Sequence, residues 1–388
     1  MLNPRIPTRN PRSPARAAYL HIPFCLRKCA YCDFNSYAGR ESLWPEYVRT
    51  LGLEIRSAAT YKAAPLETVY LGGGTPTVLS PDDLLRLLDA VSGSFGLAAG
   101  AEVSIEANPG TVTLESLRRL RNGGFNRLSL GAQSFDDDLL NRVGRVHTAD
   151  EAVRAYLDAR EAGFDNVGVD LICALPGQDQ AMWESDLRRL TDLRPEHASL
   201  YELTLAQGTP LAEDVAGGRL AVPDEDTQLE MLLTGLSMLT GAGYDRYEVS
   251  NYALPGFKCR HNQTYWRCED YHGFGAGACS FIGGARRRNV SGPEEYIGRM
   301  VTGKSVVESS ERPDEKQRVA EMLMLSMRTT EGLDLRAFKQ RFGYAFADAY
   351  PDRLSALRDR GLAALSGDRL QPTKQGILLA DEVAGWFL

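Results

Sequence analysis

The chain has 388 residues, of which 43% are hydrophobic and 24% charged, so it can form one large domain and one or two smaller ones. The formal net charge of −7 argues against a broad nucleic-acid interface, because such an interface needs a surplus of Lys and Arg. The sequence has no apolar run of roughly eighteen residues and no signal-peptide pattern, so we expect a cytoplasmic protein.

Residues 1–18 read as a flexible tail rich in arginine and proline. Its arginines, Arg5, Arg9, Arg12 and Arg16, can touch an anionic membrane surface, although short tails of this composition are usually solvated. We assign the tail no function, and a peripheral contact with the inner face of the membrane stays open.

Six short β-rich runs alternate with helical patterns, and we assign residues 19–205 to this repeat. Helix-start signals stand between the runs: Ser80 precedes Pro81, and Thr148 with Glu151 forms a capping-box pattern. Apolar strands alternating with helices predict a parallel sheet covered by helices, and six units predict a partial (β/α)6 barrel. The predicted strands are Ala18–Ile22, Thr68–Leu71, Glu102–Ala107, Arg127–Leu130, Val167–Leu171 and Ala198–Leu203.

Unusual polar residues gather where these strands end. In parallel β/α folds the carboxyl ends of the strands meet at one edge, where the chemistry is usually found. The pattern therefore predicts one site at that edge. His21 and three cysteines follow the first strand, residues 72–77 the second and residues 106–109 the third, while Gln133 follows the fourth and Asp170 closes the fifth.

The repeat fades after residue 205. Residues 206–310 form an irregular α+β segment that we expect to cap the barrel. Residues 311–388 carry helical runs around Val319, Leu335 and Leu354, then a hairpin at Leu362–Leu370 and a helix from Thr373, an order that resembles a winged helix. Because this region has twelve basic and twelve acidic residues, a structural or partner-docking role is favoured over DNA binding.

Three of the seven cysteines, Cys25, Cys29 and Cys32, lie within eight residues. Thiolates are the usual ligands of iron–sulfur clusters, and three of them leave one iron of a four-iron cluster open. A zinc site completed by His21 or a distant histidine is the alternative. The other cysteines suit buried apolar roles rather than disulfides and stay unassigned; they are Cys173, Cys259, Cys268 and Cys279.

The Cys-x3-Cys-x2-Cys spacing after the first strand resembles the signature of the radical S-adenosylmethionine superfamily, whose fold is a partial β/α barrel. The stretch from Tyr19 to Cys25 is similar to a branch that contains oxygen-independent coproporphyrinogen dehydrogenases and heme chaperones. The resemblance runs nearly end to end. It implies that the three cysteines hold a 4Fe-4S cluster whose open iron binds S-adenosylmethionine.

The resemblance also implies which residues surround S-adenosylmethionine. Gly73, Gly74 and Thr75 would let the backbone approach the methionyl amine, because glycine has no Cβ; a plain strand-to-helix turn is the alternative for this run. Polar family positions are Glu106, Gln133, Arg145 and Asp170, and aromatic neighbours are Tyr19 and Tyr31. Surface, strand-end or core-packing roles are the alternatives for these six residues.

Three differences favour a heme chaperone over a dehydrogenase within this branch. Phe34 stands where the dehydrogenases usually carry a fourth cysteine, and only eighteen residues precede Tyr19. His261 begins a sequence that matches the HNxxYW motif of the chaperones, and an imidazole beside two aromatic rings can ligate heme iron. A zinc knot with Cys259, Cys268 and His272, or a hydrogen-bonded loop histidine, is the alternative.

We therefore predict a heme chaperone that carries heme as cargo, together with the cluster and S-adenosylmethionine. Its expected partners are heme-accepting apoproteins such as respiratory cytochromes, not nucleic acid, and a homodimer stays open. No catalytic residue is assigned. The alternatives are an oxygen-independent coproporphyrinogen III dehydrogenase, which is an enzyme, and a structural zinc protein with a DNA-binding tail.

Overall fold

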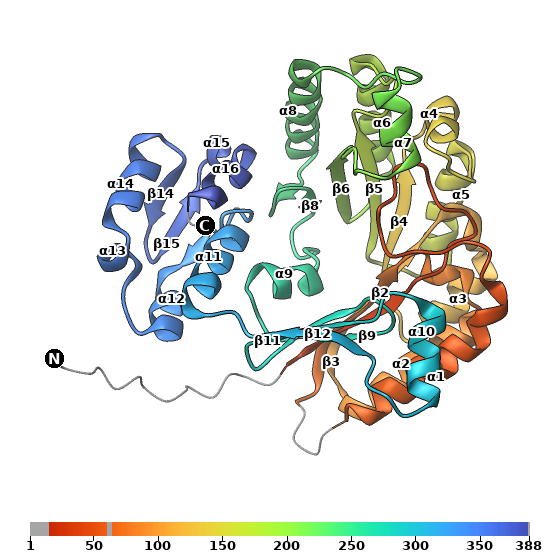
Figure 1. Cartoon of the computed structure of the whole chain (residues 1–388). Coiled ribbons are helices and arrows are strands. Elements are labelled where there is room, and N and C mark those ends of the chain that lie inside the picture. The colour runs from red at the N-terminus through yellow and green to blue at the C-terminus, as the bar shows by residue number, and fades with distance from the viewer. Residues whose placement is uncertain (1–14, 60–63, 387–388) are drawn as a thin grey trace.

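A parallel half-barrel forms the centre of the computed structural model, which describes residues 15–59 and 64–386 (Figure 1). All six predicted strands are present, pair in chain order and run parallel. The partial-barrel prediction is therefore confirmed. The strands are β1 (Ala17–Ile22), β2 (Leu66–Gly73), β3 (Leu97–Ala107), β4 (Arg127–Gln133), β5 (Val167–Cys173) and β6 (His197–Glu202).

Helices cover the outside of this sheet (Figure 1). Both predicted helix starts are confirmed: the Ser80 hydroxyl accepts from the Asp83 amide at 3.2 Å, and Thr148 and Glu151 cap each other reciprocally. The helices are α1 (Trp44–Ser57), α2 (Pro81–Phe95), α3 (Leu114–Asn122), α4 (Asp137–Arg142), α5 (Ala149–Glu161), α6 (Gln180–Leu193), α7 (Pro210–Ala216) and α8 (Glu225–Gly241).

The segment 206–310 contributes strands to the barrel sheet as well as covering it. Strand β8 (Asn251–Ala253) pairs antiparallel with β6 and with β7 (Asp245–Arg246), and β9 (His272–Phe274) pairs parallel with β1, giving nine strands. Strands of two or three residues are too short to show a period of two, so these three strands were not predicted.

The remainder of this segment forms a helix and a small antiparallel sheet. Helix α9 (Arg260–Trp266) carries the HNxxYW motif, and α10 (Pro293–Val301) packs against α1. The small sheet is β10 (Cys279–Ile282), β11 (Ala285–Asn289) and β12 (Val307–Glu311).

The expected tail ends earlier than predicted. Ala17 and Ala18 already belong to β1, and the Arg16 guanidinium pairs with Glu67. Arg5, Arg9 and Arg12 lie outside the described residues. Within the described part of the chain, no helix combines the length and apolarity needed to cross a bilayer.

The C-terminal unit has the predicted helical runs, hairpin and closing helix in that order, and it adds a two-residue strand, Leu333–Asp334, that was not predicted. Its core forms around Leu323, Phe338 and Leu370, separate from the barrel core. The elements are α11 (Glu315–Ser326), β13 (Leu333–Asp334), α12 (Leu335–Phe342), α13 (Phe346–Ala349), α14 (Pro351–Asp359), β14 (Ala363–Ser366), β15 (Arg369–Pro372), α15 (Lys374–Leu378) and α16 (Ala380–Gly385).

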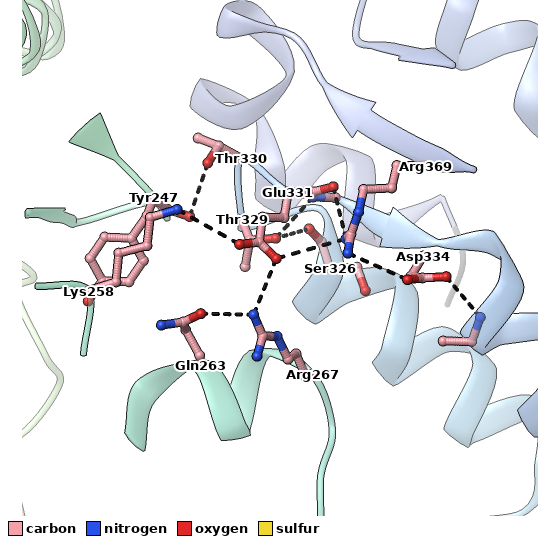
Figure 2. Close-up of polar contacts among 12 residues, drawn as sticks. Tyr247, Lys258, Gln263, Arg267, Ser326, Thr329, Thr330, Glu331, Asp334 and Arg369 are labelled. Carbon is pink, nitrogen blue, oxygen red and sulfur yellow. Dashed lines mark hydrogen bonds and ion pairs between the residues drawn. The ribbon is translucent and has the colours of Figure 1, made fainter. Parts of the chain in front are cut away.

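The C-terminal unit docks on the barrel beside α9, through the contacts drawn in Figure 2. Two backbone hydrogen bonds join it to the segment before β8: Val249 N donates to Arg328 O at 2.9 Å, and Thr330 N donates to Tyr247 O at 3.1 Å. The Glu331 carboxylate also faces three cations, Lys258, Arg267 and Arg369, at 3.8, 3.4 and 3.9 Å. Because these ion pairs are partly exposed, their main effect is to fix the orientation of the unit.

Glu54, on α1, ties the segment 206–310 to the barrel. Its buried carboxylate accepts hydrogen bonds from Gly275 N at 2.8 Å, Asn289 Nδ2 at 2.7 Å and Tyr296 Oη at 2.6 Å. Burial raises the pKa of this carboxyl, and the three hydrogen bonds oppose that shift.

Replacing Glu54 by Ala should lower the free energy of unfolding by on the order of 2–4 kcal/mol, because three buried donors lose their acceptor. The measurement is urea denaturation of the full chain. Glu46→Ala is the matched control: Glu46 lies on the same helix and pairs with Arg49 at the surface, so its loss should change the free energy by less than about 1 kcal/mol. Equal effects of both substitutions would contradict the role assigned to Glu54.

Candidate functional site

The three clustered cysteines lie on the loop between β1 and α1, at the carboxyl edge of the sheet. Backbone hydrogen bonds hold this loop: Cys25 N donates to Tyr37 O at 3.0 Å, Cys32 N to Cys29 O at 3.2 Å, and Ala30 N to Val143 O at 3.0 Å. All three thiols are free and half-buried, whereas Cys173 and Cys259 are buried. The predicted cluster ligands are therefore the accessible thiols of a fixed loop.

Polar groups from two other loops lie beside these thiols. Thr75 Oγ1 donates to Cys25 Sγ at 3.6 Å, and Arg145 Nη1 donates to Cys29 Sγ at 3.5 Å. Burial raises the pKa of Cys25, and the hydrogen bond from Thr75 opposes this effect. The thiolate is the form of cysteine that binds iron.

The described side chains around the cysteines do not form a ready-made site for a single zinc ion. Among the described residues, no three His, Cys, Asp or Glu side chains converge on a point that would hold one ion. Cluster ligands need not converge, because each thiolate binds a different iron. His21, the nearest histidine in the sequence, has both ring nitrogens hydrogen-bonded, to Tyr19 Oη at 3.0 Å and to Asn35 O at 2.8 Å.

The glycine run after β2 serves contacts within the protein. A Cβ on Gly73, whose φ is +117°, would lie 2.5 Å from the His21 ring, and one on Gly74 would lie 2.5 Å from Phe24 O. Gly74 N also donates to Ile22 O at 2.8 Å, and Thr75 N to Phe24 O at 2.7 Å. These glycines therefore let the end of β2 close onto the segment that leads into the cysteine loop.

Glu106 is the next-to-last residue of β3, whereas Asp170 lies in the middle of β5 rather than at its end, as the sequence had suggested. Glu106 accepts hydrogen bonds from Tyr70 Oη at 2.9 Å and from Gly73 N at 3.1 Å. Burial raises the pKa of Glu106 to about 7, although these two bonds oppose the shift. Burial also raises the pKa of Asp170, which accepts from Ser129 Oγ at 3.1 Å. Both carboxyls keep acceptor capacity for a ligand.

Gln133 and Arg145 each have a buried polar atom without a protein partner. Gln133 sits at a bulge opposite β5 with φ +70°, and its buried Oε1 has no hydrogen bond. Arg145 Nη2 donates to Asn108 Oδ1 at 2.5 Å and to Gly131 O at 2.6 Å, while its Nε is unpaired. Unsatisfied buried groups beside strained backbone are typical of ligand sites. A ligand carboxylate that pairs with Arg145 would therefore share this guanidinium with Asn108 and Cys29.

The two aromatic positions have different surroundings. Tyr31 packs beside Leu139, Val143 and Ile172 at the carboxyl edge, close to Arg145 and Cys29. Tyr19 lies deeper, with its ring 6.3 Å from that of Tyr70, and burial raises its pKa. Tyr31 is therefore the aromatic residue nearer the cysteines.

His261 differs from the expectation for a heme ligand. It is 1% exposed and faces the barrel interior, where Nδ1 lies 2.8 Å from Thr68 Oγ1 and Nε2 lies 2.8 Å from Tyr265 Oη. Both ring nitrogens are therefore engaged, and ligation of iron would require one of these bonds to break. This arrangement corresponds to the alternative of a hydrogen-bonded histidine.

Sequence reasoning missed three polar residues of this interior. Asn108 bridges Arg145 and Thr75, whose Oγ1 accepts from Asn108 Nδ2 at 2.8 Å. Tyr70 holds Glu106, and Arg127 is fully buried at the start of β4. Asn108 belongs to the Glu-Ala-Asn-Pro stretch already singled out, but Tyr70 and Arg127 read as ordinary strand residues.

Comparison with known proteins agrees with this geometry. Residues 19–190 match the radical SAM superfamily, and residues 314–379 match the HemN C-terminal domain. The heme chaperone HemW of Bacillus subtilis is 36% identical over 96% of this chain and 99% of its own length. The chain belongs to the HemW branch of the radical SAM superfamily.

Other members of this superfamily extend the comparison. Heme chaperone HemW of Escherichia coli is 39% identical, over 78% of this chain and 81% of that protein. A solved structure of the radical SAM enzyme coproporphyrinogen III oxidase (HemN) from Escherichia coli has a TM-score of 0.84 at 26% identity. That likeness covers 98% of this chain and 91% of that one. The radical SAM fold, including the small C-terminal domain, is thus shared with the HemN structure.

Proposed function

We propose that this protein is a heme chaperone that binds a 4Fe-4S cluster and S-adenosylmethionine and passes heme to apoproteins such as respiratory cytochromes. The observation that carries the proposal is the end-to-end similarity to relatives named heme chaperone HemW. The setting we propose is the cytoplasm, with peripheral contact at the inner face of the membrane and a homodimer as further expectations.

Cys25, Cys29 and Cys32 would hold the cluster. Their accessible thiols, the Arg145 guanidinium beside Cys29 and the fixed backbone of the loop support this assignment. When bound, the cluster supplies an open iron for S-adenosylmethionine and an electron for its radical chemistry. Protein residues exclude water from this edge: Tyr31 and the apolar residues around it cover one side.

S-adenosylmethionine would lie along the carboxyl edge next to the cluster. Gly73, Gly74 and Thr75 border one side, Gln133 and Arg145 supply partly unsatisfied polar atoms, and Glu106 and Asp170 supply acceptors for hydroxyl groups. Tyr19 lies below them in the barrel interior.

A cavity beside α9 supports the heme part of the proposal. It encloses about 510 Å³, a size suited to a cofactor, and residues of the HNxxYW motif, Gln263 and Thr264, line it. Arg260, Arg267 and Arg341 line it as well, and guanidinium groups pair with carboxylates such as heme propionates.

The alternative function is oxidative decarboxylation of coproporphyrinogen III, which the likeness to HemN favours. Phe34 lies just beyond Cys32, the last proposed cluster ligand, and is 66% exposed. The family resemblance implies that the dehydrogenases carry a fourth cysteine at this position. This difference favours the chaperone.

Anaerobically reconstituted protein should contain about four irons per chain and show a reduced-cluster resonance that changes on addition of S-adenosylmethionine, because three thiolates leave one iron open. Cys29→Ser should abolish the resonance, while Cys173→Ser, which alters a buried cysteine, should preserve it. Stoichiometric zinc in freshly isolated protein, without charge-transfer absorption, would rule out the cluster.

Glu106→Ala and Asp170→Ala should each weaken binding of S-adenosylmethionine by roughly ten- to a hundredfold, since a buried hydrogen bond to a charged group contributes about 1.5–3 kcal/mol. Iron content should not change, because the hydrogen bonds of Glu106 and Asp170 within the described part of the chain go to strand residues and not to the cysteine loop. Equilibrium dialysis with radiolabelled S-adenosylmethionine measures the effect. If both variants bind S-adenosylmethionine with the native affinity, Glu106 and Asp170 are not part of its binding site.

Heme should bind at about one per chain, also after the cluster is removed, because α9 and the cysteine loop supply different residues. Arg341→Gln should weaken heme binding if the cavity receives the propionates, whereas Arg353→Gln, elsewhere in the C-terminal unit, should not. His261→Ala tests the predicted ligand directly: a changed heme spectrum supports ligation. Protoporphyrinogen formed at many turnovers per chain, under reducing conditions with S-adenosylmethionine, would replace the chaperone proposal by the dehydrogenase.

A further inference from the structure

Tyr70 connects the candidate cofactor site to the helix that carries the HNxxYW motif. Its hydroxyl donates to Glu106 Oε1 at 2.9 Å. Its ring stacks on His261, with ring centroids 5.2 Å apart and ring planes 25° from parallel. One side chain on β2 therefore touches a residue proposed to bind S-adenosylmethionine and the histidine of α9.

The Tyr70 hydroxyl fixes the orientation of the Glu106 carboxylate. The second oxygen, Oε2, accepts from Gly73 N at 3.1 Å, so each carboxylate oxygen has one donor from β2. A Cβ on Gly72 would lie 2.9 Å from the Glu106 carboxylate, so this group lies directly against the glycine run. Without the hydroxyl, only the Gly73 amide would hold the carboxylate.

His261 in turn fixes the Tyr70 ring. Its imidazole is held by Thr68 Oγ1 on β2 and by Tyr265 Oη on α9 itself. Thr68 and Tyr70 are two residues apart on one strand, so both point to the same face of the sheet. The His261 imidazole is therefore hydrogen-bonded to β2, the same strand that carries the Tyr70 ring on which it stacks.

Glu102 anchors α9 to β3 by its backbone. The Glu102 carboxylate accepts from Arg260 N and His261 N, each at 3.0 Å. Glu102 and Glu106 are four residues apart on β3 and so also share the interior face. The same two strands that carry Tyr70 and Glu106 thus hold the motif helix.

We propose that Tyr70 is a positioning residue of the cofactor site: it orients the Glu106 carboxylate, and the stacked ring of His261 keeps it in place. The proposal rests on the proposed function in one respect, that Glu106 binds S-adenosylmethionine. It gives the motif histidine a role in cofactor binding, whether or not heme is bound.

The hydrogen bond also affects when Glu106 is ionised. Burial raises the pKa of Glu106 to about 7, and the bond from Tyr70 opposes that rise, so removing the hydroxyl should raise the pKa further. If the ionised Glu106 carboxylate is the binding form, the affinity for S-adenosylmethionine increases as pH rises through the pKa of Glu106. Without the Tyr70 hydroxyl, the pH midpoint of this increase moves upward. The other charged or titratable groups around Glu106 are Asp170, Arg127, Tyr19, Tyr201 and Tyr265, and none of them is altered by the substitution.

The experiment measures the affinity of the cluster-reconstituted full chain for S-adenosylmethionine between pH 6 and pH 9. Tyr70→Phe, which keeps the ring, should bind roughly tenfold more weakly at pH 7, with its pH midpoint shifted upward. Tyr244→Phe is the matched control, because it also loses a buried hydroxyl bond, to Pro195 O at 2.5 Å, far along the chain from the cofactor residues. This control should keep the native affinity and midpoint.

A double-mutant cycle tests the part played by His261. His261→Ala should weaken cofactor binding in the native background and have little further effect when combined with Tyr70→Phe, because both act through one hydroxyl. Thr68→Val, which removes only the Nδ1 partner of the imidazole, should give a smaller effect of the same kind if His261→Ala fails to fold.

The outcomes separate this proposal from the one on which it rests. If Glu106→Ala weakens binding but Tyr70→Phe keeps the native affinity and pH midpoint, Tyr70 is not a positioning residue. If the effects of Tyr70→Phe and His261→Ala simply add, the imidazole does not act through Tyr70. If Glu106→Ala itself binds normally, the assigned cofactor site is wrong.

Discussion

The burial of charged side chains inside a parallel half-barrel is the constraint on which the rest of the structure depends. Glu102, Glu106 and Asp170 project from the strands into the interior, and Arg127 is buried beside them. A buried charge is stable only when hydrogen bonds replace its lost water, so each group demands partners from neighbouring elements. Those partners determine where the glycine run, the tyrosines and helix α9 must lie.

Two carboxylates use the same physical device at different places. Glu102 accepts from the first backbone amides of α9, and Glu54 accepts from three donors of the segment that contains β9, β11 and α10. In both cases a carboxylate on a barrel element accepts hydrogen bonds from the segment 206–310, whose own strands are short. The cap is therefore fastened by specific polar contacts in addition to apolar packing.

Helix α9 lies between the barrel interior and a cavity beside the C-terminal unit. His261 faces the interior, where it stacks on Tyr70, while Gln263 and Thr264 line the cavity that also contains Arg341 of the C-terminal unit. The Glu331 contacts in Figure 2 hold that unit against the same helix. A change at His261 can therefore affect the cavity through one turn of α9, and a change in the cavity can affect His261 in the same way.

The sequence by itself determined the local features: six strands, their helix caps, the loop cysteines and the glycine run, because each depends on residue order and short-range spacing. The tertiary structure decided what no short window can contain. It recruited β8 and β9 to the barrel sheet, engaged both nitrogens of His261, and joined Tyr70 to Glu106 across two strands. These contacts join residues up to 254 positions apart, as between Ala18 and His272, and their partners are chosen by burial in a shared interior, which local patterns do not record.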